Sequence, residues 1–251
     1  MLSKNQVKFI HSLQVKKNRM KEGVFVAEGP KAVSDISCLL QPRLVFATCE
    51  WVERNSPRFS VNVVTDDELR KISFLQHPQQ VLAVFPMLLD GEDEGGVDCS
   101  SLSLALDGIQ DPGNLGTIIR IADWFGIARI FCSLDSADVY NPKVVQATMG
   151  SIARVRVTYV DLRELLASLP SDFPVYGTFL DGDNIYEKSL TPNGMIVMGN
   201  EGKGISPALR PQISRRLLIP SFSRNERSAE SLNVAVATAI ACSEFRRVLA
   251  K

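Results

Sequence analysis

The chain has 251 residues, of which 45% are hydrophobic and 22% charged, and these proportions exclude a disordered or collagen-like protein. Its 28 basic and 28 acidic residues cancel, so the net charge gives no sign of a nucleic-acid partner. No segment approaches the roughly 18 consecutive apolar residues of a membrane span, and the basic first segment lacks the apolar core of a signal peptide. We therefore expect a cytoplasmic protein that contacts no membrane.

Residues 1–90 alternate between helical and extended patterns, which predicts a small α/β domain. The expected elements are a basic amphipathic helix over about 4–20, a strand at 23–27, a helix from about 30, a strand at 43–48, a helix near 66–74 and a strand at 80–85. Residues 91–103 are rich in Gly, Asp, Glu and Ser and carry no apolar period. This composition predicts an acidic linker.

Residues 104–251 form the second predicted domain, in which strand and helix patterns alternate more regularly. Strands are expected over 102–109, 128–133, 155–160, 174–180, 195–200 and 215–221, and helices over 116–126, 142–154, 161–169 and 231–250. Continuous apolar strands separated by helices predict a parallel sheet that is covered on both faces. The predicted fold class is therefore α/β.

Polar loops follow four of these strands. They are residues 110–117, 181–184, 200–204 and a loop that ends at 231–233. Each could be ordinary turn chemistry. Because ligands of open parallel sheets bind at the carboxyl ends of the strands, four such loops at one edge favour a ligand pocket.

Several motifs that the sequence lacks argue against particular classes of enzyme. The two histidines, His11 and His77, both precede the linker, so the second domain has no Ser-His-Asp or Cys-His pair of its own. The dinucleotide fingerprint and the P-loop are absent from the sequence, which argues against an NAD oxidoreductase and a P-loop ATPase. Five scattered cysteines without a C-x-x-C pair predict no disulfide framework and no zinc site. Arg120, on an otherwise apolar helix face with Ile118, Ile119 and Ile121, suits an anion such as phosphate, or else caps a sheet carbonyl.

Three ordered motifs resemble the SpoU (TrmH-like) branch of the SPOUT RNA methyltransferases. They are residues 111–117 with Arg120, residues 197–204, and Ile219-Pro220 followed by 231–237. Residues 25–29 resemble the ribosomal-protein-like substrate-binding module that often precedes this core. The resemblance implies S-adenosylmethionine as methyl donor, a ribose 2′-hydroxyl of ribosomal or transfer RNA as acceptor, a deep trefoil knot in the C-terminal domain, and a homodimer.

The same resemblance makes Arg120 the central catalytic residue. An arginine guanidinium does not readily give up its proton, which favours a role in holding phosphate and stabilising the alkoxide, while a role as base stays open. The other catalytic candidates are Asn114, Glu201, Ser231 and Asn233. The donor is expected, largely through backbone groups, at Thr178, Gly199, Glu201, Gly202, Ile219 and Leu232. The loop 221–230 departs from the family pattern, being longer and without its glycine.

One segment of the chain is basic, although the whole chain has no net charge. Residues 1–31 carry seven Lys or Arg against two Glu. Positive side chains that neutralise phosphates dominate nucleic-acid affinity, so this segment predicts an RNA contact, although a solvated helix face is the alternative. The predicted RNA-binding residues are Lys16, Lys17, Arg19 and Lys21, with Arg224 and Arg227 in the long loop.

Two other functions stay open at this point. A catalytically silent RNA-binding protein on the same fold need not bind S-adenosylmethionine, so calorimetry with that donor separates it from an enzyme. A nucleotide-dependent oxidoreductase would bind reduced nicotinamide, but the missing fingerprint argues against it.

Overall fold

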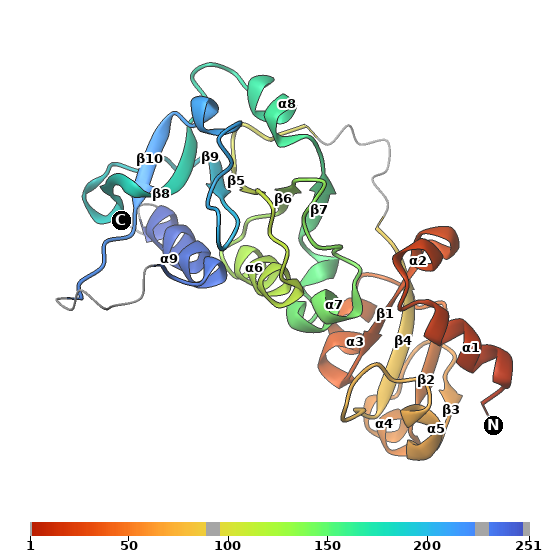
Figure 1. The fold of residues 1–251 in the computed structure, drawn as a ribbon. Helices are drawn as coiled ribbons and strands as arrows, with labels where there is room; N and C mark the ends of the chain where they lie inside the picture. The colour runs from red at the N-terminus through yellow and green to blue at the C-terminus, as the bar shows by residue number, and fades with distance from the viewer. Residues whose placement is uncertain (1, 89–95, 224–230, 248–251) are drawn as a thin grey trace. The chain divides into compact units, whose positions relative to one another are not determined.

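The computed structural model describes residues 2–88, 96–223 and 231–247. The chain divides into two units, Met1–Leu89 with Asp138–Arg154, and Asp90–Ala137 with Val155–Lys251 (Figure 1). No helix within the described ranges is long and apolar enough to cross a membrane.

A mixed four-stranded sheet in the order β1-β4-β2-β3 forms the centre of the first unit. Strands β1 and β2 run antiparallel to β4, and β3 runs parallel to β2. The strands are β1 (Val24–Glu28), β2 (Leu44–Ala47), β3 (Asn62–Val63) and β4 (Val81–Pro86), and the helices are α1 (Lys4–Ser12), α2 (Lys16–Glu22), α3 (Pro30–Ser37), α4 (Cys49–Asn55) and α5 (Asp66–Arg70). The sequence patterns did not predict α4 or β3. Both are short, and Trp51 is the one buried residue in α4 while both residues of β3 are exposed, so neither has an apolar period to detect.

The single helix expected over about 4–20 is wrong, because the structure has two helices with a break after α1. Leu13 at the break is fully buried in the same core cluster as Ile10, Val26 and Leu82. The Nη1 group of Arg19 in α2 donates to the carbonyl oxygens of Leu13 and Gln14 at 2.7 Å each. These bonds satisfy carbonyls that the helix end leaves without a partner. A side chain from the next helix therefore stabilises the break.

The segment 138–154 belongs to the first unit, whereas the sequence predicts it in the second domain, with one helix over 142–154. It contains α7 (Pro142–Thr148), which contacts the edge strand β1, and the 3₁₀ helix η1 (Ser151–Ala153). The Tyr140 ring stacks on Phe25 at 5.0 Å, and its hydroxyl donates to the Leu88 carbonyl. Helix α7 ends because Met149 and Gly150 both have positive φ. A Cβ atom on Gly150 would lie 2.6 Å from the Cβ of Asp35, so this approach to α3 requires glycine.

Six parallel strands in the order β10-β8-β9-β5-β6-β7 form the sheet of the second unit. They are β5 (Leu102–Leu106), β6 (Arg129–Cys132), β7 (Arg156–Tyr159), β8 (Val175–Asn184), β9 (Gly194–Met198) and β10 (Arg215–Leu218). The predicted parallel α/β sheet is confirmed. The polar residues 181–184 are not a loop as predicted. They extend β8, because Asp183 and Asn184 pair with Leu217 and Leu218 of β10 after a register shift.

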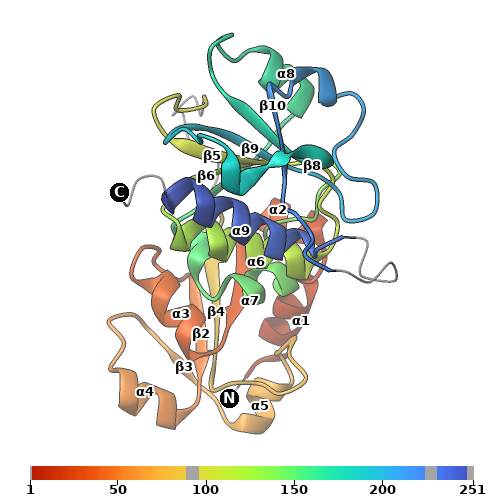
Figure 2. The same ribbon diagram turned by 90° about the vertical axis from the view of Figure 1, so that its left-hand side faces the viewer.

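Helices cover both faces of this sheet. On one face α8 (Leu162–Ala167) packs Leu162 and Leu166 in the same cluster as Phe131 and Val197. On the other, α6 (Pro112–Trp124) and α9 (Val234–Arg247) lie side by side, as Figures 1 and 2 show. The Phe245 ring of α9 meets Tyr176 of β8 edge-on at 4.7 Å. The short 3₁₀ helices η2 (Ile185–Glu187) and η3 (Arg210–Gln212) complete the unit.

Candidate active site

The loop after β5 forms the first part of the candidate active site. Asp107 accepts the backbone N–H of Ser206 at 2.7 Å, and Gly108, with a φ of 68°, donates its N–H to Ser133 Oγ. Asp111 then caps α6 by accepting the N–H of Asn114 at 2.8 Å, and Pro112 takes the first helical position. The Asp-Pro-Gly-Asn sequence therefore makes an abrupt helix start at the carboxyl edge of the sheet.

The loop after β9 lies beside it. Asn200 donates its side-chain amide to the Gly108 carbonyl at 2.7 Å and accepts the N–H groups of Gly202 and Lys203. A Cβ on Gly199 would lie 2.2 Å from the carbonyl carbon of Gly204, so only glycine fits this crossing. The Asn200 side chain thus stabilises its own loop and joins it to the loop after β5.

A chain of side-chain hydrogen bonds brings three of the predicted catalytic residues together. Asn233 donates to Asn114 Oδ1 at 2.9 Å, and Asn114 donates to Glu201 Oε1 at 2.9 Å. Asn233 also accepts the N–H groups of Ala235 and Val236, which makes it the N-cap of α9. Because both groups of the Asn114 amide are engaged, its orientation is determined by its partners. These hydrogen bonds join the first turns of α6 and α9 to the loop after β9.

Arg120 and Ser231 are not joined to that chain. Arg120 is exposed on α6, while its neighbours Ile118 and Ile119 are buried, so it does not lie on the apolar face. The expectation of an apolar surrounding is wrong because adjacent helical residues point in different directions. Arg120 makes no hydrogen bond or ion pair with any residue that the structure describes, so it caps no sheet carbonyl there. Ser231 is exposed as well.

The predicted donor-binding residues lie on or just after three adjacent strands, except Leu232, which precedes the Asn233 cap of α9. Thr178 is half-buried on β8, with its Oγ1 3.8 Å from Met198 Sδ, and Ile219 is half-buried directly after β10. A Cβ on Gly202 would meet only Asn200 Oδ1, at 3.8 Å, so the backbone there faces open space. Leu232 is 50% exposed. The residues after parallel neighbouring strands share one edge, which is where such sheets bind ligands. Within the described ranges, no group of three or more His, Cys, Asp or Glu side chains could hold a metal ion.

The predicted RNA-binding residues have different outcomes. Lys16, Lys17 and Lys21 are exposed on α2. The prediction for Arg19 is wrong, because this side chain is 1% exposed and its guanidinium pairs with Asp138 besides the two carbonyls at the end of α1. Charge counting along the sequence cannot distinguish a buried arginine from its exposed neighbours. Arg224 and Arg227 lie outside the described residues, as does most of the 221–230 loop.

Sequence reasoning missed the supporting residues Asp107 and Ser133. The available signal was their position, since each directly follows a buried strand whose carboxyl end lies at the ligand edge. Their partners, the Ser206 and Gly108 N–H groups, come from other loops. Only the fold reveals these pairings.

The sheet and its tied loops define a parallel α/β protein that offers polar side chains and open backbone at one strand edge. The chain belongs to the SpoU rRNA methylase family, whose model matches residues 101–243. Residues 4–83 match the MRM3-like substrate binding domain.

Individual relatives extend over nearly the whole chain. The protein is 31% identical to the 23S rRNA (guanosine(2553)-2′-O)-methyltransferase RlmP of Bacillus subtilis, with 95% of each chain covered. A TrmH-family structure from Porphyromonas gingivalis is 42% identical, with a TM-score of 0.87 and 99% of each chain covered. An AdoMet-bound rRNA methyltransferase from Sinorhizobium meliloti is 27% identical, with a TM-score of 0.84 and coverage of 99% of this chain and 97% of that one.

Proposed function

We propose that this protein is an S-adenosylmethionine-dependent RNA methyltransferase that methylates a ribose 2′-hydroxyl of ribosomal RNA, in the cytoplasm. The observation that carries the proposal is the hydrogen-bond chain from Asn233 through Asn114 to Glu201. It links all three family motifs at the ligand edge of the sheet. Transfer RNA is the second candidate substrate, since the family resemblance covers both.

The residues at this edge fit the donor. The backbone at Gly202 is open, and Ile219 and Leu232 leave apolar surface uncovered, which suits an adenine ring and polar sugar groups together. Thr178, Gly199 and Glu201 complete the proposed donor site. When bound, the sulfonium supplies an electrophilic methyl group and leaves as a neutral thioether.

Arg120 is proposed to hold an RNA phosphate and to stabilise negative charge on the attacking 2′-oxygen. Exposure leaves its guanidinium available, and a planar fork of donors matches phosphate oxygens. The 2′-oxygen forms a bond to the methyl carbon as the carbon–sulfur bond breaks, and the hydroxyl proton passes to water or phosphate. Asn114 and Glu201 position the loops, while Ser231 and Asn233 are proposed to contact the ribose.

The decisive experiment supplies the purified protein with methyl-labelled S-adenosylmethionine and ribosomal RNA from cells that lack its gene. We expect label at one ribose, which mapping of 2′-O-methylation in cells with and without the gene identifies. RNA binding without donor binding by calorimetry and without methyl transfer would support a silent RNA-binding protein instead. Binding of reduced nicotinamide in its place would support an oxidoreductase.

A homodimer and the trefoil knot are further parts of the proposal. Trp124 at the end of α6 is 84% exposed, and Leu232 and Val236, around the start of the neighbouring helix α9, are about half exposed. Exposed large apolar side chains on one pair of helices mark an interaction surface. A second copy of this chain is the occupant that the family resemblance indicates.

Replacing Trp124 by glutamate is expected to raise the dimer dissociation constant by about 30-fold or more, because buried tryptophans at interface centres contribute at least about 2 kcal/mol. Sedimentation over a range of protein concentrations measures the shift. Leu39→Glu, at a position 56% exposed in the first unit, is the matched control and should leave the dimer unchanged. A wild-type protein that stays monomeric at every concentration and still methylates RNA would contradict the dimer.

Substituting Lys16, Lys17 and Lys21 together with glutamine is expected to weaken RNA binding and flatten its salt dependence. Three lost phosphate contacts should reduce the slope of log K against log salt by about 2 units. Filter binding at several salt concentrations measures that slope. A control with Arg58, Lys71 and Lys188 changed to glutamine removes the same charge from scattered exposed sites outside residues 1–31. If the slope of log K against log salt is the same in the two triple variants, α2 is an ordinary solvated helix that does not contact RNA.

A further inference from the structure

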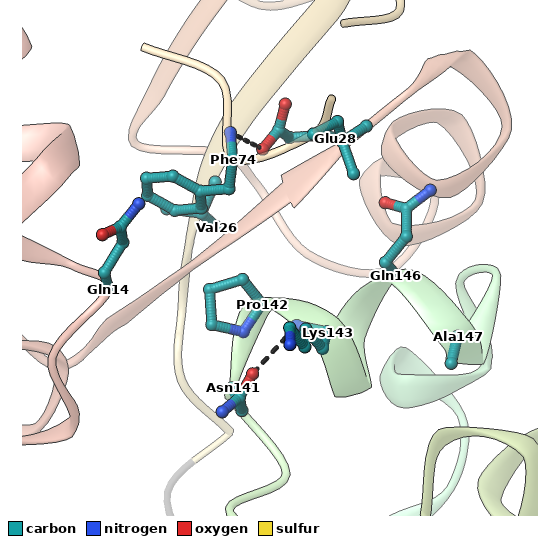
Figure 3. Close-up of a pocket in the computed structure, with 10 residues that line it drawn as sticks. Gln14, Val26, Glu28, Phe74, Asn141, Pro142, Lys143, Gln146 and Ala147 are labelled. Carbon is teal, nitrogen blue, oxygen red and sulfur yellow. Dashed lines mark hydrogen bonds between the residues drawn. The ribbon is translucent and has the colours of Figure 1, made fainter. Parts of the chain in front are cut away.

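A cavity of about 460 Å³ lies in the first unit and shares no lining residue with the hydrogen-bonded cluster of the active site, which belongs to the second unit. Strand β1 contributes Val26 and Glu28, the segment after α5 contributes Phe74, and α7 contributes Pro142, Gln146 and Ala147. In Figure 3, Glu28 and Phe74 lie on one side of the cavity and the α7 residues on the other. Its volume falls within the range of about 300–1,000 Å³ that is typical of small-molecule pockets.

The walls combine flat apolar surface with a few hydrogen-bonding groups. The Phe74 ring, Val26 and Pro142 supply the apolar part, and Phe74 is only partly buried. The Gln146 amide supplies both a donor and an acceptor. Such walls suit a planar heteroaromatic group, which stacks on one surface and forms hydrogen bonds through its edge.

Glu28 is the unusual member of the wall. Its side chain accepts the Phe74 N–H at 2.8 Å and the Ser73 hydroxyl at 2.5 Å, and the residue is 6% exposed. Burial raises the pKa of this carboxyl, while the hydrogen bonds from Ser73 and Phe74 lower it in part. A carboxylate has about four lone-pair positions, so two stay available after these bonds. The methyl-transfer chemistry does not use this buried acid.

A lysine side chain also lines this cavity. Lys143 is exposed, contributes to the lining, and has no ion pair with any residue in the described ranges. An ammonium group beside an apolar slot matches a nucleotide, in which a phosphate lies a few bonds from a flat base. The cavity thus offers a stacking surface, an edge for hydrogen bonds and a positive charge.

We infer that this cavity binds one unstacked nucleobase of the RNA substrate, with Phe74 stacking on the base and Glu28 and Gln146 hydrogen-bonding to its edge. The inference rests on the proposed RNA substrate and adds a base-reading site to it. Single-stranded RNA is recognised in this way when bases leave the stack and meet aromatic and polar side chains.

The test uses the full chain, unmodified 23S ribosomal RNA made by transcription, and the four nucleoside 5′-monophosphates. Ala147→Phe fills the cavity from α7, and Phe74→Ala removes the stacking surface. Each should raise the dissociation constant for the RNA by about 10-fold or more and abolish monophosphate binding. Glu28→Gln should change which monophosphate binds most tightly, because an acceptor becomes a donor. Ala128→Phe, at an exposed alanine of the second unit, is the control.

Donor binding by calorimetry separates this inference from the proposed function. We expect donor binding to be unchanged in all four variants, and the fluorescence of the buried Trp51, measured in a Trp124→Phe background, verifies that the first unit is folded. Folded cavity variants that bind the RNA as tightly as wild type would overturn the base site and leave the methyltransferase intact. Monophosphate binding that is lost in the variants while RNA affinity is unchanged would show a small-molecule pocket and also overturn it. Wild-type protein that binds donor but no RNA would overturn both proposals.

Discussion

Replacing Arg120 by alanine is expected to lower the rate of methyl transfer by about 100-fold or more at saturating donor, because removing one group that stabilises transition-state charge typically has that effect. The affinity for S-adenosylmethionine should change little, since the proposed contact is to the RNA and the attacking oxygen. Single-turnover methylation and calorimetry measure the two quantities separately. Arg54→Ala, an exposed arginine on α4, is the control.

A second variant distinguishes the two roles open to Arg120. Arg120→Lys retains a positive charge but not the planar fork, so it should retain part of the activity with the wild-type pH dependence. If residue 120 accepts the proton, the lysine variant should instead gain a basic limb near the pKa of a lysine, about 10.4. Lost donor binding with normal turnover of each bound complex would remove Arg120 from the catalytic site altogether.

Replacing Asp138 by alanine is expected to destabilise the first unit by about 3–5 kcal/mol, because it leaves a buried charge without its counterion. The Asp138 carboxylate pairs with Arg19, whose side chain is 2% exposed, and it also accepts the Tyr140 N–H. The Nε atom of Arg19 is already without a partner among the described atoms, so no other group in that part of the chain replaces the lost one. Urea unfolding followed by Trp51 fluorescence in a Trp124→Phe background reports on this unit.

Two further variants make the stability test specific. Arg19→Met combined with Asp138→Ala removes both charges and should recover most of the loss, since apolar replacements of buried pairs are often neutral. Lys188→Ala breaks an exposed pair with Asp183 and should cost less than about 1 kcal/mol. A loss no larger in Asp138→Ala than in Lys188→Ala would mean that the buried pair does not hold segment 138–154 to this unit.

The elements that local patterns predicted best are those whose environment is uniform. β5, β6 and β9 are buried at nearly every position, so their apolar runs indicated buried parallel strands without any knowledge of partners. The existence of α6 was predicted as well, but its start was expected at 116, whereas Asp111 caps the helix and Pro112 begins it. Patterns failed where an element depends on a group outside its own helix or strand. The break after α1 needs Arg19, and the end of β8 needs β10.

The active site shows the same division. Local sequence identified the motifs around Asn114, Glu201 and Asn233, but their hydrogen bonds join residues 87 and 119 positions apart. Spacing of that length carries no geometric information, because the chain between them can follow many paths. The burial of Arg19 was invisible for the same reason, since its partner Asp138 is 119 residues away.

The sequence by itself determined the α/β class, the parallel strands and the residues that the ligand edge would carry, because apolar period, helix caps and motif order act over short stretches. The tertiary structure alone decided that segment 138–154 packs with the first unit, that Arg19 serves the fold instead of an RNA surface, and that a cavity forms beside Glu28. Each of these depends on which surfaces meet, and two surfaces far apart in the chain meet only when the whole unit has folded.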